Sequence, residues 1–549
     1  MTVFRTTFNA PNGTEPDGST HYDEVRFPTD ADIVSLKSYA KAGTSAEILP
    51  GDNVQVAIAK LEKRTEETEM SVSDLVSSLD GKTFGVLPHL TITAPTGATV
   101  TAINDETEVE AVELKVGPVG VYQCSLPHLG DWTVSTTKEG HTGSRTVSVS
   151  EVKDYKVRTS NGYRYGIKIK KGEGSPANRV EYIYDAAGMT PAHMDFTRGI
   201  FDYGDWEDVF FVKDNKPCMV RSDGTVGYYL DPDNYDKKED GTASDVSSSS
   251  YDGNAMSEFP LIWVYRYEDS EYQYEIVSDV QYDENYKAYA HTRADGSIAE
   301  HMYYSMFGGS GSATKIRSLA GQSLAQSLTA QQEITGATAN GSGWYTHSWS
   351  QRELIRTLLT IMGKSTNTQA VFGNGNCHQS ASSASALLAT GTLKGMGQFY
   401  GYNDSTHQVK VFHIEGFWGD QWDRVAGLIN NSGTIYAKMT PEGTGYRITD
   451  VTGYTNTGIS APSGSQAYIS ATSCSEFGMI PTAVSGSATT YFCDGYWANN
   501  SQLDYLLVGA CAAPAVGVGG GFAFAVDYPP AAAVWYYGCG LSLLEPAAA

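Results

Sequence analysis

The chain has 549 residues, more than one ordinary domain holds, so two to four domains are expected. It carries 38 Lys and Arg against 63 Asp and Glu, and the net charge of −25 argues against a nucleic-acid partner because it repels phosphate. The 35 Tyr and 57 Gly, with only 18% charged residues, are typical of β-rich, loop-rich proteins whose aromatic rings supply contact surface.

The spacing of the cysteines and the composition of the first twenty residues argue against three further classes of feature. The seven cysteines are irregularly spaced and include no CxxC pair, so neither a zinc site nor a disulfide scaffold is expected. Residues 1–20 lack the charged start and apolar core of a signal peptide, so none is expected.

The sequence of the N-terminal part predicts an extended arm followed by a helix. Residues 1–50 are polar and rich in Gly, Pro and Thr, which predicts an extended attachment arm. Within residues 51–80, apolar positions recur from Val54 to Leu79 in alternating steps of four and three, which predicts a helix with one apolar stripe. We interpret this helix as a short oligomerising coiled coil; an amphipathic helix packed on its own domain is the alternative.

Two β-rich regions follow. Residues 84–155 alternate apolar and polar positions between Gly and Pro turns, which predicts a small Ig-like β-sandwich that acts as a spacer. Residues 155–310 hold more strand patterns, and residues 348–362 give the clearest helical signal, with Leu354 and Leu358 on one apolar face.

A charge-free run from residue 505 to residue 526 is long enough to span a bilayer. Pro514 and the three glycines at 519–521 break a helix there, and the flanking residues are Asp504 and Asp527 rather than Lys or Arg. The run therefore predicts a buried strand plus a loop, with a membrane span as the alternative.

No motif in the chain predicts catalysis. HExxH, Walker, GxSxG and strand-linked GxGxxG patterns are all absent from the sequence. The segment Asp231–Asp236 begins like a calcium loop, but Asp236 stands where the sharp turn needs Gly and Thr242 where a bidentate Glu is required. We expect no metal, no cofactor and no enzyme activity, although a wall- or capsule-degrading enzyme with paired carboxylates stays open.

Several motifs, in order, resemble a known family. EGFWGDQWDR at 415–424 resembles the WGN-x-W-x-W element of formylglycine-generating-enzyme-type C-type-lectin folds, and residues 348–362 occupy the place of that fold's helix. With YFCDGYWANNS at 491–501 and GCGLSL at 538–543, residues 155–545 resemble tail proteins of phages and prophages of gut Firmicutes. The resemblance implies a C-type-lectin-like domain over 156–549, and with the sandwich a mostly β fold with some α.

Members of that family are often diversified by retroelements, as is the similar major tropism determinant of a Bordetella phage. The resemblance implies a variable region over about 497–545 on a constant scaffold. The implied scaffold comprises Trp418, Trp422, Trp497, Asn499, Asn500, Gly509, Trp535, Gly538 and Ser542. The implied variable, ligand-contacting positions are Asp504, Tyr505, Ala510, Cys511, Ala513, Pro514, Val516, Phe524, Asp527, Tyr528, Ala533, Val534, Tyr536 and Tyr537. Here Cys539 and Gly540 stand inside the family's usual closing stretch, so the end of the variation is uncertain.

The resemblance also implies a function. It predicts a receptor-binding protein of the phage tail, located on the virion, that binds a protein or glycan of the bacterial host surface. The N-terminus would contact other tail proteins, the chain would form a homotrimer, and no membrane insertion is expected. The copper-binding cysteine pair of the related oxidising enzymes has no match among Cys474, Cys493, Cys511 and Cys539, so an inert binding domain is favoured. A tail-associated hydrolase, a prophage-encoded surface binding protein and a purely structural tail component are the alternatives.

Overall fold

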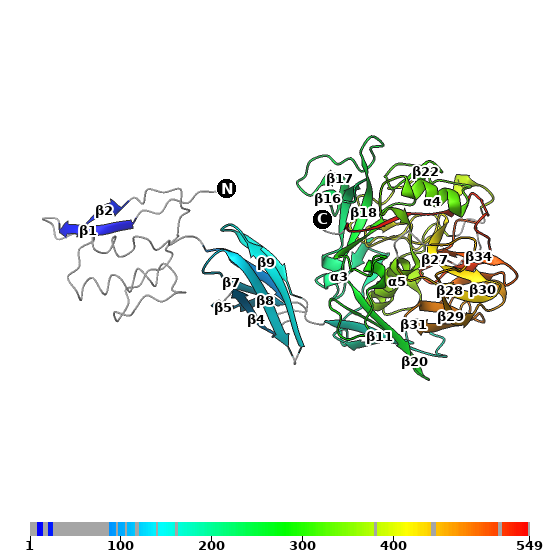
Figure 1. Cartoon of the computed structure of the whole chain (residues 1–549), viewed down its shortest axis with the longest axis horizontal. Coiled ribbons are helices and arrows are strands. Elements are labelled where there is room, and N and C mark those ends of the chain that lie inside the picture. The colour runs from blue at the N-terminus through cyan, green and yellow to red at the C-terminus, as the bar shows by residue number, and fades with distance from the viewer. Residues whose placement is uncertain are drawn as a thin grey trace. The chain divides into compact units, whose positions relative to one another are not determined.

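The computed structural model describes two compact units, residues 1–161 and 162–549 (Figure 1). The described residues are 8–14, 20–25, 87–94, 97–104, 107–115, 120–138, 141–159, 163–377, 381–440, 446–513 and 519–546. Strands make up 42% and helices 9% of the structure, which confirms the predicted mostly β fold with some α. The predicted coiled coil at 51–80 lies outside the described residues, whereas the predicted arm contains an antiparallel hairpin, β1 (Phe8–Thr14) with β2 (Thr20–Val25).

The first unit contains a two-sheet sandwich. One sheet has the order β10 (Asp154–Arg158), β3 (His89–Ala94), β7 (Gly120–Ser125) and β6 (Val112–Lys115). The other has the order β5 (Thr107–Glu110), β4 (Thr99–Asn104), β8 (Gly130–Lys138) and β9 (His141–Val149). Leu90 of one sheet and Trp132 of the other are fully buried in a shared core, because the alternating pattern points every second side chain inward.

The sandwich extends past its predicted end. The strand β10 pairs in parallel with β3 as far as Arg158, so residues 156–159 belong to the first unit rather than to the C-terminal domain that we expected to begin at 156. The two-sheet architecture is as expected, and a relationship to immunoglobulin domains stays a prediction.

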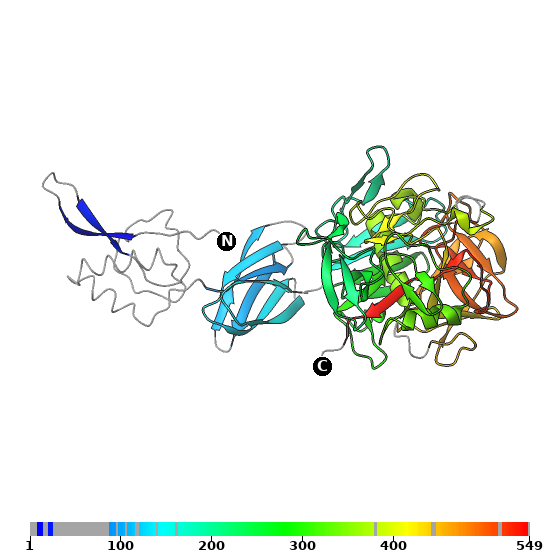
Figure 2. The ribbon, with the colours of Figure 1, turned by 90° about the horizontal axis from the view of Figure 1, so that it is seen from above.

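The second unit is built from three larger sheets and several hairpins. The four-stranded sheet has the order β12 (Val180–Tyr184), β11 (Arg164–Lys170), β20 (Tyr272–Ser278) and β19 (Trp263–Glu268). The seven-stranded sheet has the order β17 (Asn234–Lys238), β16 (Val226–Asp231), β15 (Lys216–Arg221), β18 (Gly253–Pro260), β21 (His301–Ser305), β37 (Leu541–Leu544) and β24 (Tyr345–Thr346). The strand β37 thus returns from the C-terminal part of the chain to lie beside β21. Its red ribbon runs among green ribbons of the second unit in both views (Figures 1 and 2).

The eight-stranded sheet carries the C-terminal segment. Its order is β29 (Thr455–Ser460), β28 (Thr434–Ala437), β27 (Trp422–Asn431), β34 (Leu503–Val508), β35 (Phe524–Val526), β33 (Gly495–Ala498) and β30 (Gly464–Tyr468), with β36 (Tyr537–Gly538) paired to β27. Four hairpins complete the strands: β13 (His193–Asp195) with β14 (Ile200–Asp202), β22 (Ser310–Ser312) with β23 (Lys315–Arg317), β25 (Lys410–Val411) with β26 (Ile414–Glu415), and β31 (Ala471–Ser475) with β32 (Gly478–Ala483).

The predicted helix is the central one. It is α5 (Trp349–Gly363), and it begins where the side chain of Ser348 accepts a hydrogen bond from the backbone N–H of Gln351. The expectation of a single apolar face was too narrow, because nearly every residue of α5 is buried, including charged ones. The other helices of the described residues are α3 (Phe210–Lys213), α4 (Ala330–Thr338), α6 (Thr368–Phe372) and the short 3₁₀ turns Tyr289–His291 and Ala384–Ala386.

The charge-free run forms buried strands. Residues of β34 and β35 pair antiparallel, with Leu507 opposite Ala525, and both strands are buried. This confirms a strand-and-loop structure for the part of the run that the structure describes, while residues 514–518 lie outside it. Among the described residues, no helix is long and apolar enough to cross a membrane.

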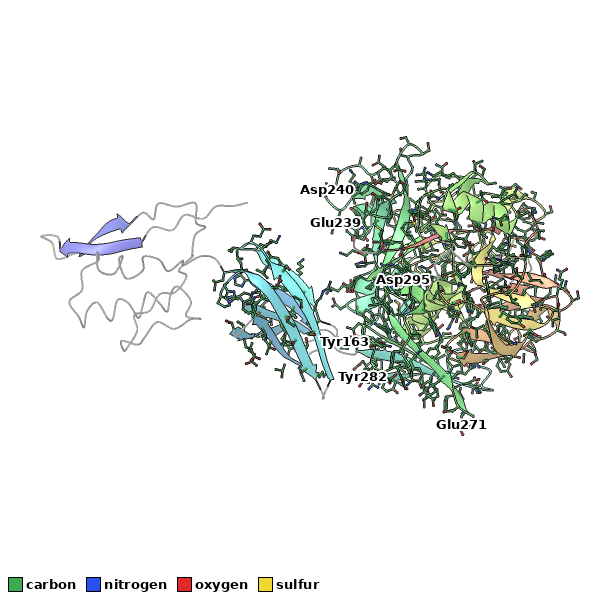
Figure 3. All side chains as sticks on the ribbon, viewed as in Figure 1. Tyr163, Glu239, Asp240, Glu271, Tyr282 and Asp295 are labelled. Atoms are coloured by element: carbon green, nitrogen blue, oxygen red, sulfur yellow. The ribbon has the colours of Figure 1, made fainter. Side chains whose placement is uncertain are left out.

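Several acidic residues of the second unit lie on exposed turns. Exposed carboxylates such as Glu239, Asp240 and Glu271 lie at the outside of the second unit (Figure 3). Asp295 is exposed in a similar turn, where its carboxylate accepts from the backbone N–H of Ser297 at 2.8 Å. Water solvates these groups, so the charge serves solubility rather than a buried site.

Candidate functional site

The segment from residue 526 to residue 537 connects β35 to β36, and β27 and the residue before it hold the backbone of the segment. Gln421 donates from its side-chain amide to the carbonyls of Trp535 at 2.7 Å and Tyr537 at 3.1 Å. The backbone N–H of Trp422 donates to the carbonyl of Tyr536 at 2.9 Å. Three successive carbonyls are therefore satisfied by groups that lie outside the segment.

The first half of the segment is held in the same way. The guanidinium of Arg424 donates to the carbonyl of Ala532 at 3.0 Å and forms an ion pair with Glu333 at 2.8 Å. The first residue of α4, Ala330, donates its N–H to the carbonyl of Pro530 at 2.9 Å. Arg424 and Glu333 are almost fully buried, so these contacts fix the backbone without help from the side chains that it displays.

Four aromatic side chains form a continuous cluster on this segment, which we call the aromatic ridge: Tyr528, Trp535, Tyr536 and Tyr537. The rings of Tyr528 and Tyr537 lie 5.2 Å apart, and those of Tyr536 and Tyr537 lie 4.9 Å apart. Tyr528 is 37% exposed, Trp535 and Tyr536 are half-buried, and Tyr537 is buried beneath them. Amphipathic rings that are held rigidly and partly exposed are typical of binding surfaces.

The structure exposes only part of the predicted contact surface. Tyr528 and Ala533 are exposed. The partly exposed predicted positions are Ala513, Asp527, Val534 and Tyr536. The buried ones are Asp504, Tyr505, Ala510, Cys511, Phe524 and Tyr537. Pro514 and Val516 lie outside the described residues.

For the six buried positions, the expectation of direct ligand contact is wrong in this structure. Both Asp504 and Tyr505 lie in β34 and are buried, and the side chain of Tyr505 packs in a core cluster with Tyr345, Ile429 and Tyr446. Phe524 stacks on the ring of Tyr496 with centroids 6.0 Å apart. Much of the described stretch after residue 510 is therefore packed core rather than contact surface.

The predicted scaffold residues lie where support is needed. Trp418 is 1% exposed, and its indole N–H donates to the carbonyl of Gly373 at 3.1 Å. Trp422 packs edge-on against Trp497 at 5.2 Å. The side-chain amide of Asn430 donates to the carbonyl of Asn499 and to the side chain of Asn500, both at 3.1 Å. Of the remaining predicted scaffold positions, Gly509, Gly538 and Ser542 are buried.

Two carboxyl groups beside the ridge have raised pKa values. Burial raises the pKa of Asp504 to about 6, and one of its oxygens has no partner among the described residues. Burial, together with the charge of Asp504, raises the pKa of Asp527 to about 7. This part of the protein therefore takes up protons close to neutral pH.

A second feature, which the sequence did not predict, is a cavity of about 50 Å³ whose lining includes Gln421, one of the residues that hold the ridge segment. Its lining includes Ser305 at the end of β21, His347 just after β24, and Asp423 in β27. Ser305 Oγ lies 2.9 Å from His347 Nε2, and His347 Nδ1 lies 2.7 Å from Asp423 Oδ2. The three residues are far apart in the sequence and belong to no local motif, so only the pairing of distant strands could reveal them.

The sequence matches no protein-family model, and a search of the curated proteins finds no significant match.

Proposed function

We propose that this protein is a receptor-binding protein of a phage tail, which attaches the virion to a bacterial host through the aromatic ridge and its neighbours. The observation that carries the proposal is that backbone carbonyls between residues 530 and 537 accept hydrogen bonds from Gln421, Arg424 and the start of α4, which lie outside the segment. The family resemblance of residues 155–545 supports the same function.

A surface that accepts many side chains needs a conformation that does not depend on them. Most substitutions cost about 1 kcal/mol, because they remove packing or hydrogen bonds that the fold requires. At Tyr528, Ala533, Val534 and Tyr536, the side chain can change while the hydrogen bonds to the segment's carbonyls stay in place. We therefore limit the proposed contact surface to these four positions together with the partly exposed Ala513 and Asp527.

The chemistry of this surface suits a neutral receptor group. Tyrosine and tryptophan rings stack on sugars or apolar side chains, and their polar atoms supply hydrogen bonds. Trimerisation through residues 51–80 would place several such surfaces on one particle, and weak sites then combine into strong attachment. Programmed diversification belongs to the same proposal, and its test is a nearby reverse transcriptase gene with a template repeat that matches the last codons.

The direct test is adsorption of the purified full chain to host cells. We expect Tyr528→Ala and Tyr536→Ala to reduce binding by about 10-fold or more each, as loss of a central aromatic contact does. Tyr272→Ala is the matched control, because Tyr272 is a partly exposed tyrosine on β20, in a different sheet. Unchanged adsorption of both ridge variants would remove the proposed surface.

A second measurement separates the alternatives. A tail protein is present in purified virions, whereas a prophage-encoded surface binding protein is found on the bacterial cell and not in particles. A purely structural tail component is present in virions but binds no host cells.

A further inference from the structure

The side chains of Ser305, His347 and Asp423 form a chain of two hydrogen bonds. Asp423 accepts the Nδ1–H of His347 at 2.7 Å, which leaves the lone pair of Nε2 facing the hydroxyl of Ser305 at 2.9 Å. The backbone N–H of Leu541 donates to Ser305 Oγ at 3.1 Å, so the serine hydroxyl keeps its own proton for His347. This order of hydroxyl, imidazole and carboxylate is the one that activates a serine nucleophile.

Neighbouring groups hold the imidazole in this orientation. The ring of Tyr304 stacks on that of His347 with centroids 3.6 Å apart, and its hydroxyl donates to Asp423 at 3.2 Å. Gly540 lies against the pair: a Cβ there would come within 2.0 Å of His347 Cε1 and 2.4 Å of Ser305 Oγ. A glycine at this position leaves the room that the two side chains occupy.

The cavity holds a cation with free donors. Arg352 of α5 lines it and is 1% exposed, and its Nε and Nη2 have no hydrogen-bond partner among the described residues. The guanidinium lies over the ring of Phe417, 3.4 Å from its centroid, and a buried cation with two unsatisfied donor atoms attracts a negative charge more strongly than it would in water. It is placed to stabilise negative charge that develops in the cavity.

The volume limits the ligand. About 50 Å³ of water-accessible space holds a few water-sized groups, which is enough for a two-carbon acyl group. Ser305 is 1% exposed, so a substrate reaches it only with a small group that enters the cavity.

We propose that Ser305, His347 and Asp423 form an active site that hydrolyses short-chain esters such as O-acetyl groups. Ser305 Oγ attacks the ester carbonyl carbon while His347 Nε2 takes the hydroxyl proton; the C–O bond to the alcohol breaks and the alcohol leaves with that proton. Water then gives its proton to His347 and attacks the acyl-serine, the acyl–Oγ bond breaks, and Ser305 regains the proton as acetate leaves. Asp423 keeps the imidazole oriented, and Arg352 stabilises the oxyanion.

This activity is independent of receptor binding through the ridge, so either can fail alone. A tail protein that bears both would bind a host surface polymer and remove acetyl esters from it.

The test uses the purified full chain and two chromogenic esters, p-nitrophenyl acetate and p-nitrophenyl octanoate. We expect turnover of the acetate, little turnover of the octanoate, and a loss of at least about 100-fold in Ser305→Ala. Ser542→Ala is the matched control, because Ser542 is a buried serine of β37 whose hydroxyl donates to the carbonyl of Thr346. Its rate should stay at that of the parent chain.

A covalent label makes the test independent of any variant. Methanesulfonyl fluoride is small enough for the cavity and should sulfonylate Ser305 in the parent chain, seen as a mass shift of the peptide that contains it. Equal acetate turnover in the parent chain and Ser305→Ala overturns the proposal. Absence of both turnover and the Ser305 adduct overturns it as well, even if Ser305→Ala fails to fold.

Discussion

Arg356 donates through both Nη atoms to the carboxylate of Glu275, at 2.5 and 2.6 Å, and neither side chain is exposed to solvent. This bidentate pair joins the central helix α5 to β20 of the four-stranded sheet. Burial opposes ionisation of Glu275, but the charges of Arg356 and Arg266 outweigh it and hold its pKa at about 2.

Glu275→Gln should therefore destabilise the second unit by about 3 kcal/mol or more, because it leaves a buried guanidinium without its main counter-charge. Since the folded-state pKa of Glu275 lies below its unfolded value, its contribution is present above about pH 4.5 and is lost as the pH falls toward 2. Chemical denaturation at pH 7 and pH 3 measures this, and the variant should lose less stability than the parent chain over that range. A variant as stable as the parent at pH 7 would contradict the prediction.

Gln421→Ala should lower the stability of the second unit and increase the mobility of the aromatic ridge. It removes the donor to the carbonyls of Trp535 and Tyr537, and also to that of Ala325 at 2.9 Å, so we expect a loss of about 1–3 kcal/mol. Hydrogen exchange by mass spectrometry should show faster exchange in the peptide that covers residues 535–537. Gln331→Ala, at an exposed position of α4, should change neither quantity.

Tyr505→Phe tests the correction to the predicted contact surface. The hydroxyl of Tyr505 is buried and has no partner among the described residues, so its removal relieves the cost of desolvating it. We expect unfolding stability equal to or up to about 1 kcal/mol above that of the parent chain, and unchanged adsorption to host cells. A strong loss of adsorption with an intact fold would return Tyr505 to the contact surface.

The sequence predicted helices and strands better than it predicted which side chains are buried and which residues meet in space. The helix at 348–362 and the sandwich strands were found because a period of 3.6 or 2 reports one buried face. Burial on both faces leaves no such signal, so the burial of the charged residues of α5 was not predicted. Tyr505 lies in a buried strand as predicted, and only its ligand contact, which the resemblance implied, is wrong. The cavity was missed because Ser305, His347 and Asp423 share no local motif: Ser305 and His347 are 42 positions apart in the chain, and His347 and Asp423 are 76 apart.

Asp527→Asn should change how stability depends on pH. Burial and the charge of Asp504 raise the pKa of Asp527 to about 7, so the folded chain binds this proton more tightly than the unfolded chain does. Between an unfolded pKa of about 4 and the folded value, Asp527 therefore makes stability fall as the pH rises, and above about pH 7 its full penalty applies. The asparagine variant carries no charge at any pH, so it should gain stability relative to the parent at pH 8 and match it more closely at pH 5. Asp295→Asn, at an exposed turn, is the control and should show no such gain at pH 8. Thermal unfolding at both pH values measures the difference, and an equal effect of Asp527→Asn at pH 5 and pH 8 would show that the carboxyl of Asp527 does not titrate in this range.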